Sequence, residues 1–355
     1  MCFINCKVDI KKSILKNFEE KPTKEYFKVY HFLYNKEYNL NSEEGVLRYK
    51  IFKSNLNIIK EHNKKLSSFK MGVNKFTDLS PEEFRKKYLM NPELKRKQKE
   101  GLRFLSEEGY FDEYSDSDDE KLFEKSQNIS KEFNFEEKIP VDWSSSFSDV
   151  RNQGGCGSCW AFAVTGVVES FRNRKNKLNM GYLSTQQLID CDNNNGACSG
   201  GNYNYAFTYI KNTGVVDDPA YPYKEKETKC SIPANFKRQK IKSYQYCSNK
   251  SYYSTRRCTE RKVFANLALG ATATAIDGNI LNYYESGVFD ANCSEDNHAV
   301  ILVGYGISEL GTEYFKIRNS WGSDWGESGY IRIARNESNN KSCFITNESF
   351  TVTLP

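Results

Sequence analysis

Histidine, strong net charge and long apolar stretches are all scarce in this 355-residue sequence. No run of 18 or more apolar residues occurs, so no transmembrane helix is predicted. The 51 basic and 46 acidic side chains leave a net charge of +5, which gives no reason to expect a nucleic-acid partner. Only three histidines are present, and His298 is the only one after residue 62. Any imidazole chemistry in the later part of the chain therefore depends on His298.

We do not expect residues 1–20 to be a secretory signal, because lysines interrupt the apolar core that such a signal would need. The eleven cysteines nevertheless point to an oxidising compartment. We give the cysteines more weight and expect a lysosome-like compartment or an extracellular location. Nine of them lie between Cys156 and Cys343, and nine is an odd number. Four disulfides would leave one thiol over, and that thiol is a candidate nucleophile.

The chain divides into three parts of different character. Residues 20–90 have helical periodicity, and steps of three and four place six side chains on one face: Glu44, Arg48, Phe52, Asn55, Ile59 and Asn63. Residues 94–138 contain a basic and an acidic stretch with almost no periodicity, which predicts a linker. From about residue 139 onward, scattered glycines and short apolar runs predict strands. We expect an α+β fold whose three parts are residues 1–93 (helical), 94–138 (disordered and charged) and 139–355 (the main domain).

The stretch NQGGCGSCWAF, residues 152–162, holds the most informative cysteine. Cys159 begins a run, CWAFAVTGVVESF, that is apolar on nearly every side and predicts a buried helix. A thiol at a helix N-terminus is favoured as thiolate by the helix dipole and the unpaired N–H groups. Two other interpretations stay open, a buried structural cysteine and a metal or redox pair with Cys156. His298, at the head of the apolar run HAVILVGYG, is the imidazole available to activate Cys159.

Two groups of residues resemble the papain and cathepsin family of cysteine proteases. GCGSCW matches the family pattern C-G-[SA]-C-[WY], and His298 follows Cys159 by 139 residues. Asn319 follows by 160 residues, about ten later than the family spacing, and we attribute the delay to an enlarged loop at 306–314. The six helix positions above match a cathepsin L-like propeptide. So does a following G-x-N-x-F-x-D pattern, formed by Gly72, Asn74, Phe76 and Asp78. The stretches YQYCS and CFITNE are similar to insect-virus cathepsins.

The resemblance implies a catalytic set. Cys159 would be the nucleophile, and His298 its base and later the acid that protonates the leaving amine. Asn319 would orient the imidazole, and Trp321 would shield that hydrogen bond from water. Gln153 and the backbone N–H of Cys159 would form the oxyanion hole.

The resemblance also implies three disulfides, Cys156 with Cys198, Cys191 with Cys230, and Cys293 with Cys343. Cys247 and Cys258 are additional to the family set, and a bridge between them would leave Cys159 outside every pair.

A substrate site is implied in the same way. Gly200 and Gly201 would let an extended substrate pair with the backbone. The main specificity pocket, which receives the second residue before the scissile bond, would have Glu348 at its floor and Asp296 and Ala275 at its sides. Two carboxylates there predict a preference for Arg or Lys. The alternative is that Glu348 turns to solvent and leaves an apolar pocket framed by Ala275.

The fold implied is a papain-like two-lobed fold, with a helical lobe that holds the Cys159 helix, a β-barrel-like lobe, and a helical inhibitory propeptide ahead of both. We expect a cysteine endopeptidase made as an inactive zymogen and acting through a thioester. It would need no cofactor or metal, act as a monomer on proteins and peptides, and bind neither nucleic acid nor membrane. Its own propeptide would block it until acid removes the charge of Asp78. The alternative is a papain-fold protein that binds peptides without cleaving them.

Overall fold

A computed structural model describes residues 11, 13–16, 23–91, 93, 140–232, 234–247, 258–335 and 343–355. The linker expected at 94–138 lies outside these residues. Within the described ranges the protein has an N-terminal helical segment, a helical lobe and a strand lobe.

The N-terminal segment, residues 23–91, consists of α2 (Thr23–Leu33), α3 (Glu43–Lys64), β1 (Phe69–Met71) and α4 (Pro81–Tyr88). Aromatic side chains join α2 to α3, since the Tyr30 and Phe52 rings pack at a tilt with their centroids 4.7 Å apart. A capping box starts α4, because the Ser80 hydroxyl accepts from the Glu83 N–H and the Glu83 carboxylate accepts from the Ser80 N–H. Of the helix face predicted at 44–63, Phe52, Asn55 and Ile59 are buried in α3, whereas Glu44 at its start is exposed.

The helical lobe is built around α7. Its elements are η2 (Ser144–Ser146), α7 (Cys159–Asn176), α8 (Thr185–Cys191), η3 (Ala197–Ser199), α9 (Tyr203–Asn212) and η4 (Asp218–Ala220). The short strand β2 (Val141–Asp142) precedes them and pairs with the strand that begins at His298. Helix α7 is buried from Cys159 to Ser170, as its apolar sequence predicted. Gly166 allows its closest contact, because a Cβ there would lie 2.5 Å from the Ile301 side chain.

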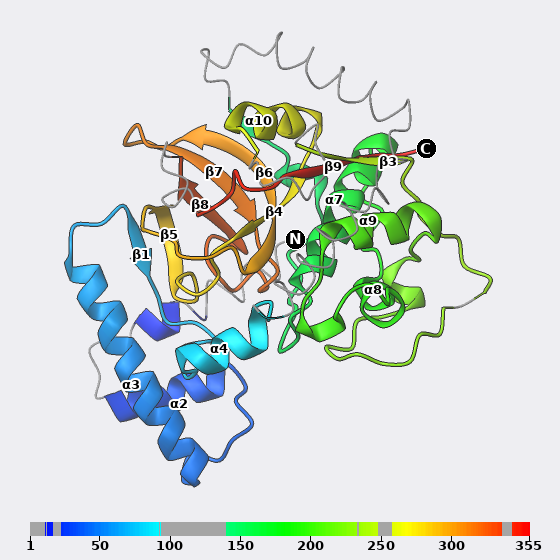
Figure 1. The fold of residues 1–355 in the computed structure, drawn as a ribbon. Helices are drawn as coiled ribbons and strands as arrows, with labels where there is room; N and C mark the ends of the chain where they lie inside the picture. Colours follow the sequence, from blue (N-terminus) through cyan, green and yellow to red (C-terminus); the bar gives the residue numbers. More distant parts are fainter. Residues whose placement is uncertain are drawn as a thin grey trace.

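The strand lobe contains β3 (Ser243–Tyr246), α10 (Glu260–Leu269), β4 (Thr272–Ile276), β5 (Tyr284–Phe289), β6 (His298–Ile307), β7 (Glu313–Arg318), β8 (Tyr330–Ala334) and β9 (Phe350–Thr353). The strand order is β1-β5-β8-β7-β6-β4-β9-β3, with β2 paired to β6. Figure 1 shows β4 to β8 on one side of the molecule and α7, α8 and α9 on the other, with β9 and β3 lying on the side of α7 and α9. The apolar run that begins at His298 is thus a central strand, as predicted.

The expected enlarged loop at 306–314 is wrong. Gly306 pairs with Tyr314 and Ile307 with Glu313, so most of this stretch extends the β6–β7 hairpin. Residues 308–312 form the turn, which is closed by the Ser308 N–H bonded to the Thr312 carbonyl at 2.9 Å. The strands thus continue to Ile307 and Glu313, which pair across a turn of five residues, and the stretch is the end of a hairpin.

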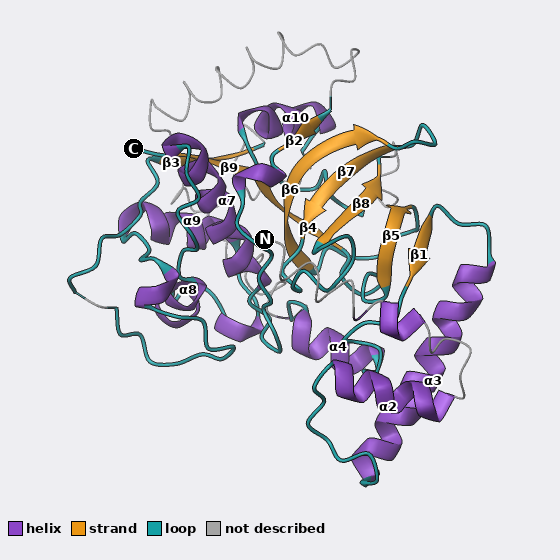
Figure 2. Ribbon diagram, turned by 180° about the vertical axis from the view of Figure 1, so that it is seen from behind, coloured by secondary structure: helices purple, strands orange, loops and turns teal. Residues whose placement is uncertain are grey.

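The N-terminal segment docks on the strand lobe through its own strand. β1 pairs antiparallel with β5, with Phe69 opposite Gly287. Figure 2 shows this pair at the edge of the sheet, with α2 and α3 beyond it and α4 near the junction of the lobes. Gly287 is needed there, because its φ is +95° and a Cβ would lie 2.4 Å from the Ser68 carbonyl oxygen.

Four disulfides join described cysteines: Cys156–Cys198, Cys191–Cys230, Cys247–Cys258 and Cys293–Cys343. Cys159 lies outside all four. Among the described residues, no helix is both long and apolar enough to cross a membrane.

Candidate active site

Cys159 is the first residue of α7 and is fully buried. Its Sγ accepts a hydrogen bond from the Ala299 N–H at 3.4 Å, so the thiol faces the start of β6. The positive end of the α7 dipole favours the thiolate form at this position. Cys156 is bonded to Cys198 and has no thiolate to share with Cys159. A metal or redox site made by these two cysteines is therefore excluded.

His298 and Asn319 come together at one end of adjacent strands. His298 begins β6 and Asn319 follows the last residue of β7, and the antiparallel register places them side by side. The His298 Nε2 and Asn319 Oδ1 atoms are 2.7 Å apart. The Trp321 ring stacks on the imidazole at a centroid distance of 4.5 Å and covers it. The hydrogen bond thus fixes the ring and leaves Nδ1 as the nitrogen for chemistry.

Burial lowers the pKa of His298 from 6.5 to about 4, against the opposing effect of the Asn319 hydrogen bond. Part of the surroundings comes from the N-terminal segment. A Cβ at Gly278 would lie 2.4 Å from the Leu89 side chain and 2.8 Å from the His298 Cβ, so both side chains meet there. In this state the imidazole is neutral at physiological pH.

Gln153 lies beside Cys159 and already holds a carbonyl group. Its Nε2 donates to the Tyr88 carbonyl oxygen at 3.0 Å and to the Cys156 carbonyl oxygen at 3.0 Å. The Ser320 hydroxyl donates to Gln153 Oε1 at 2.6 Å and sets which end of the amide faces Tyr88. Sequence reasoning missed Ser320, although its place directly after Asn319 is a signal that could have found it.

Residues 88–91 contact both lobes. The Met90 N–H donates to the Asn297 carbonyl in the strand lobe at 3.0 Å, and the Asn91 N–H donates to the Ser199 carbonyl in the helical lobe at 3.0 Å. Met90 also lies against Gly200, where a Cβ would be 3.2 Å from the Met90 Cβ. This stretch therefore occupies the same surface as Gln153, His298 and Gly200.

Lys75 makes a second contact that the sequence did not suggest. Its Nζ donates to the Trp321 carbonyl oxygen and pairs with Asp324 at 2.9 Å. Burial lowers the Lys75 pKa, and the Asp324 charge opposes this effect. The N-terminal segment is thus anchored next to the tryptophan that covers His298.

The expected pocket residues lie close to this surface. Ala275 is buried in β4 opposite Ala299, the residue after His298. The Asp296 carboxylate accepts from the Asn347 amide at 3.4 Å, which links it to the residue before Glu348. Glu348 is 9% exposed, so the residue is largely buried, whereas the alternative interpretation has it turned to solvent.

The Trp160 ring leaves no room for a side chain at Gly201, because a Cβ there would lie 2.4 Å from the ring. A side chain at this position would therefore displace the start of α7.

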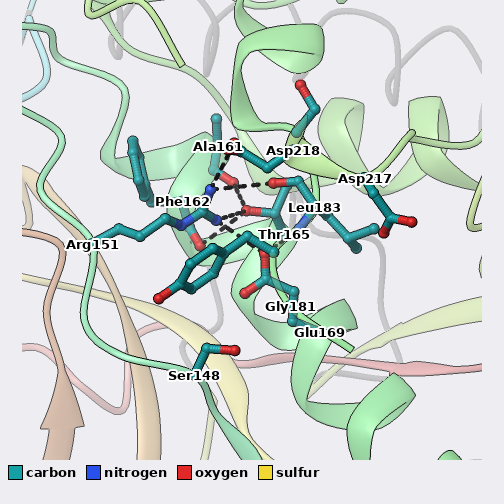
Figure 3. A network of polar contacts seen from close by, with 12 residues as sticks. Ser148, Arg151, Ala161, Phe162, Thr165, Glu169, Gly181, Leu183, Asp217 and Asp218 are labelled. Atoms are coloured by element: carbon teal, nitrogen blue, oxygen red, sulfur yellow. Dashed lines mark hydrogen bonds and ion pairs between the residues drawn. The ribbon is translucent and has the colours of Figure 1, made fainter. Parts of the chain in front are cut away.

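A buried ion network supports the loop that carries Gln153. The Arg151 guanidinium donates to Glu169 at 3.0 Å and to the Leu183 carbonyl at 3.2 Å. Figure 3 shows Arg151 reaching these groups on α7 and the chain beside it. The Glu169 carboxylate also accepts from the Leu183 N–H at 2.7 Å. Arg151, two positions before Gln153, is thus fixed to α7, the helix that begins with Cys159.

Sequence patterns of two families match this chain. The family described as "Papain family cysteine protease" matches residues 139–353, and the "Cathepsin propeptide inhibitor domain (I29)" matches residues 27–84. "Cysteine proteinase RD21A" of Arabidopsis thaliana is 37% identical over 81% of this chain. Chymopapain of Carica papaya is 35% identical over 89% of this chain and 83% of the relative. The chain spans 57% of RD21A and 60% of "Probable cysteine protease RD21B", less than two thirds of either.

Solved structures with the same fold include precursor forms. The proform of the Amb a 11 cysteine protease, a ragweed pollen allergen, has a TM-score of 0.74 and 29% identity, and covers 95% of this chain and 94% of its own. "Digestive procathepsin L 3" of Tenebrio molitor larval midgut has a TM-score of 0.71 and 29% identity, and covers 94% of this chain and 100% of its own.

Proposed function

Because the chain belongs to the papain family of cysteine proteases and carries a cathepsin propeptide inhibitor domain, we propose that it is a cysteine endopeptidase made as an inactive zymogen. The observation that carries the proposal is the 2.7 Å contact between His298 Nε2 and Asn319 Oδ1, beside a cysteine that begins a buried helix. That contact orients the imidazole with Nδ1 available to Cys159.

The reaction follows from these positions. His298 Nδ1 first takes the thiol proton of Cys159. The Cys159 sulfur attacks the scissile carbonyl carbon, and the carbonyl oxygen becomes an oxyanion held by Gln153 Nε2 and the Cys159 N–H. The C–N bond then breaks, and His298 gives its proton to the leaving amine, which leaves a thioester on Cys159. His298 next takes a proton from water, and the resulting hydroxide attacks the thioester carbon. The C–S bond then breaks, which releases the carboxylic acid product and returns the Cys159 sulfur as a thiolate beside the protonated His298. Trp321 covers the His298–Asn319 hydrogen bond throughout.

The inhibitor in this proposal is the propeptide, residues 1–93. Support comes from Tyr88, whose carbonyl accepts from the proposed oxyanion donor Gln153 at 3.0 Å. Leu89 adds to the burial that keeps the His298 pKa low, so the closed site holds a neutral imidazole. Residues 94–138 would be the linker that is cut on maturation, and residues 139–355 the active peptidase.

The proposed substrates are proteins and peptides with Arg or Lys two residues before the scissile bond. Glu348 at the pocket floor supplies a negative charge, and Asp296 a second one nearby. Ala275 leaves room between them, and Gly200 and Gly201 present backbone to an extended substrate. The inward position of Glu348 supports this preference.

We place the protein in a lysosome-like compartment or outside the cell, as a monomer that needs no cofactor or metal and binds neither nucleic acid nor membrane. The disulfides support an oxidising location.

Iodoacetamide labelling tests the proposal. The full chain, matured at acid pH, should take up one carbamidomethyl group on Cys159 and lose all hydrolysis of a Phe-Arg dipeptide substrate in parallel. The competing function, a papain-fold protein that binds peptides without cleaving them, predicts no hydrolysis in the unlabelled sample. Hydrolysis that survives complete labelling of Cys159 would contradict both.

A further inference from the structure

One tyrosine hydroxyl connects the two chain segments that supply the oxyanion donors. Tyr223 Oη donates to the Gln153 carbonyl oxygen at 2.5 Å and accepts from the Ser158 hydroxyl at 2.9 Å. Gln153 carries the side-chain donor, and Ser158 directly precedes the backbone N–H of Cys159. The Tyr223 ring is itself held edge-on against Phe162 of α7, with centroids 5.0 Å apart. The Tyr223 hydroxyl therefore links the two segments whose positions set the distance between Gln153 Nε2 and the Cys159 N–H.

Glu225, two residues after Tyr223, makes a second hydrogen bond to the loop that contains Gln153. The Glu225 carboxylate accepts from the Gly155 N–H. Gly154, between Gln153 and Gly155, has φ of +57°, and a Cβ there would lie 2.0 Å from the Glu225 carboxyl carbon. The loop thus follows the shape of the Glu225 side chain, and only glycine at 154 permits the approach.

Glu225 adopts this position at a conformational cost. Its φ is +60°, in the left-handed region that a non-glycine residue rarely occupies. The residue is exposed, so core packing does not hold it there. Strained backbone of this kind persists where surrounding contacts over-determine it, and it is concentrated at functional sites. The contact that Glu225 makes in this strained conformation is the hydrogen bond from the Gly155 N–H.

We propose that Tyr223 and Glu225 are positioning residues that hold the loop 153–155 so that the oxyanion donors are fixed before the substrate arrives. The inference rests on the proposed function of the site. Neither residue touches the reacting atoms. Arg151 holds the loop from the α7 side, and Tyr223 and Glu225 hold it from the other.

A donor that is misplaced by a fraction of an ångström loses transition-state stabilisation while ground-state binding is little affected. Loss of either support should therefore lower kcat and leave KM nearly unchanged. It should change thiolate reactivity much less than turnover, because the orientation of His298 is fixed by its own hydrogen bond to Asn319. This separation distinguishes positioning from general loss of structure.

The experiment uses Tyr223→Phe, Glu225→Gly and Glu225→Gln in the full chain after maturation. We expect Tyr223→Phe and Glu225→Gly each to lower kcat/KM about tenfold. The Ki of a reversible dipeptide aldehyde, whose adduct places its oxygen in the hole, should rise by the same factor. The rate of iodoacetamide alkylation should stay within about twofold. Glu225→Gln keeps an acceptor oxygen and should retain most activity.

Two control variants match these changes elsewhere. Lys177→Gly relieves a left-handed residue, φ +52°, at the exposed C-terminus of α7. Tyr209→Phe removes a hydroxyl that accepts from Gln187 at 3.0 Å in the same lobe. Both should leave kcat unchanged. Glu225→Gly should keep its melting temperature, since glycine suits this φ, and yet lose activity.

Unchanged kcat in Tyr223→Phe and Glu225→Gly would overturn the inference. So would equal losses in Glu225→Gln and Glu225→Gly, or a fall in alkylation as large as the fall in turnover. The wild-type chain tests the proposed function separately from the role of Tyr223 and Glu225. A wild-type chain that neither alkylates at Cys159 nor turns over substrate would contradict the proposed function.

Discussion

Several single side chains hold the closed state with the same atoms that we assign to catalysis. Gln153 Nε2 binds the Tyr88 carbonyl where a substrate oxyanion would develop. His298 is fully buried, and its Nε2 already contacts Asn319. The inhibited form therefore keeps the site assembled and differs from the active form mainly in what covers it. This agrees with the pre-organised donors that acyl transfer requires.

Glu348→Ala tests the specificity of the site in the matured enzyme. Hydrogen bonds between a buried carboxylate and a guanidinium are strong, so kcat/KM for an Arg-Arg dipeptide substrate should fall about 10- to 100-fold. The Phe-Arg substrate should change less than about threefold. Specificity constants at pH 5.5 and 7 give the ratio.

Glu309→Ala, an exposed change in the β6–β7 turn, serves as the control and should not alter that ratio. Equal losses on both substrates in Glu348→Ala would show that this carboxylate does not recognise the substrate.

One buried carboxylate, that of Asp78, binds several groups of the N-terminal segment. Asp78 accepts from Tyr30 at 2.8 Å and Tyr38 at 2.8 Å, and pairs with Lys36 at 2.7 Å. Its side chain is 2% exposed, whereas that of Lys36 is 16% exposed. Burial lowers the Lys36 pKa more than Asp78 raises it, so the lysine depends on this partner. The G-x-N-x-F-x-D pattern thus ends on the residue that joins α2 to α4.

Asp78→Asn should destabilise the N-terminal segment by about 2 to 4 kcal/mol, because it leaves Lys36 buried without a counter-charge. Denaturant unfolding of the full chain with Cys159→Ser measures this loss. In the active background, the same change should give peptidase activity at neutral pH before maturation.

Glu61→Gln removes an exposed pair with Lys64 and should have no effect. A full-length Asp78→Asn chain that is as stable and as inactive as the wild type would refute this role.

Local elements could be predicted from the sequence and long-range ones could not. The apolar run after Cys159 and the steps of three and four at 44–63 are local signals, and they became α7 and α3. The pairing of β1 with β5 joins Phe69 to Gly287, and no local pattern encodes such a separation. The ends of β6 and β7 were mistaken for a loop for a different reason, because Gly306 and Gly311 in this stretch are residues typical of turns and hid the short-range pairing of Ile307 with Glu313. The strained φ of Glu225 has no sequence signal, because it depends on a contact with the 153–155 loop.

For the whole molecule, the buried imidazole makes the closed form sensitive to acid. The folded pKa of His298 is about 4, against 6.5 for an ordinary histidine. Between these values the unfolded chain binds more protons than the folded chain, so stability is complete above 6.5 and is lost as pH falls towards 4. The full shift corresponds to about 3 kcal/mol.

Denaturant unfolding of the full-length Cys159→Ser chain at pH 6.5 and 4.5 measures this loss, and His298→Gln in the same background should reduce it. Carboxylates contribute to both variants equally, so the difference between them isolates His298. An identical pH dependence in the two variants would contradict the assignment.

The most direct test of the central claim compares turnover by the matured wild-type chain with turnover by matured Cys159→Ser. The serine hydroxyl is a far weaker nucleophile in this setting, and the expected result is loss of at least about a thousandfold in kcat with an unchanged melting temperature. Because Cys159→Ser cannot mature itself, both chains are cut by the same added protease. The account predicts a thioester acyl-enzyme in the wild type and no turnover in the variant. Undiminished peptidase activity in pure Cys159→Ser would contradict it.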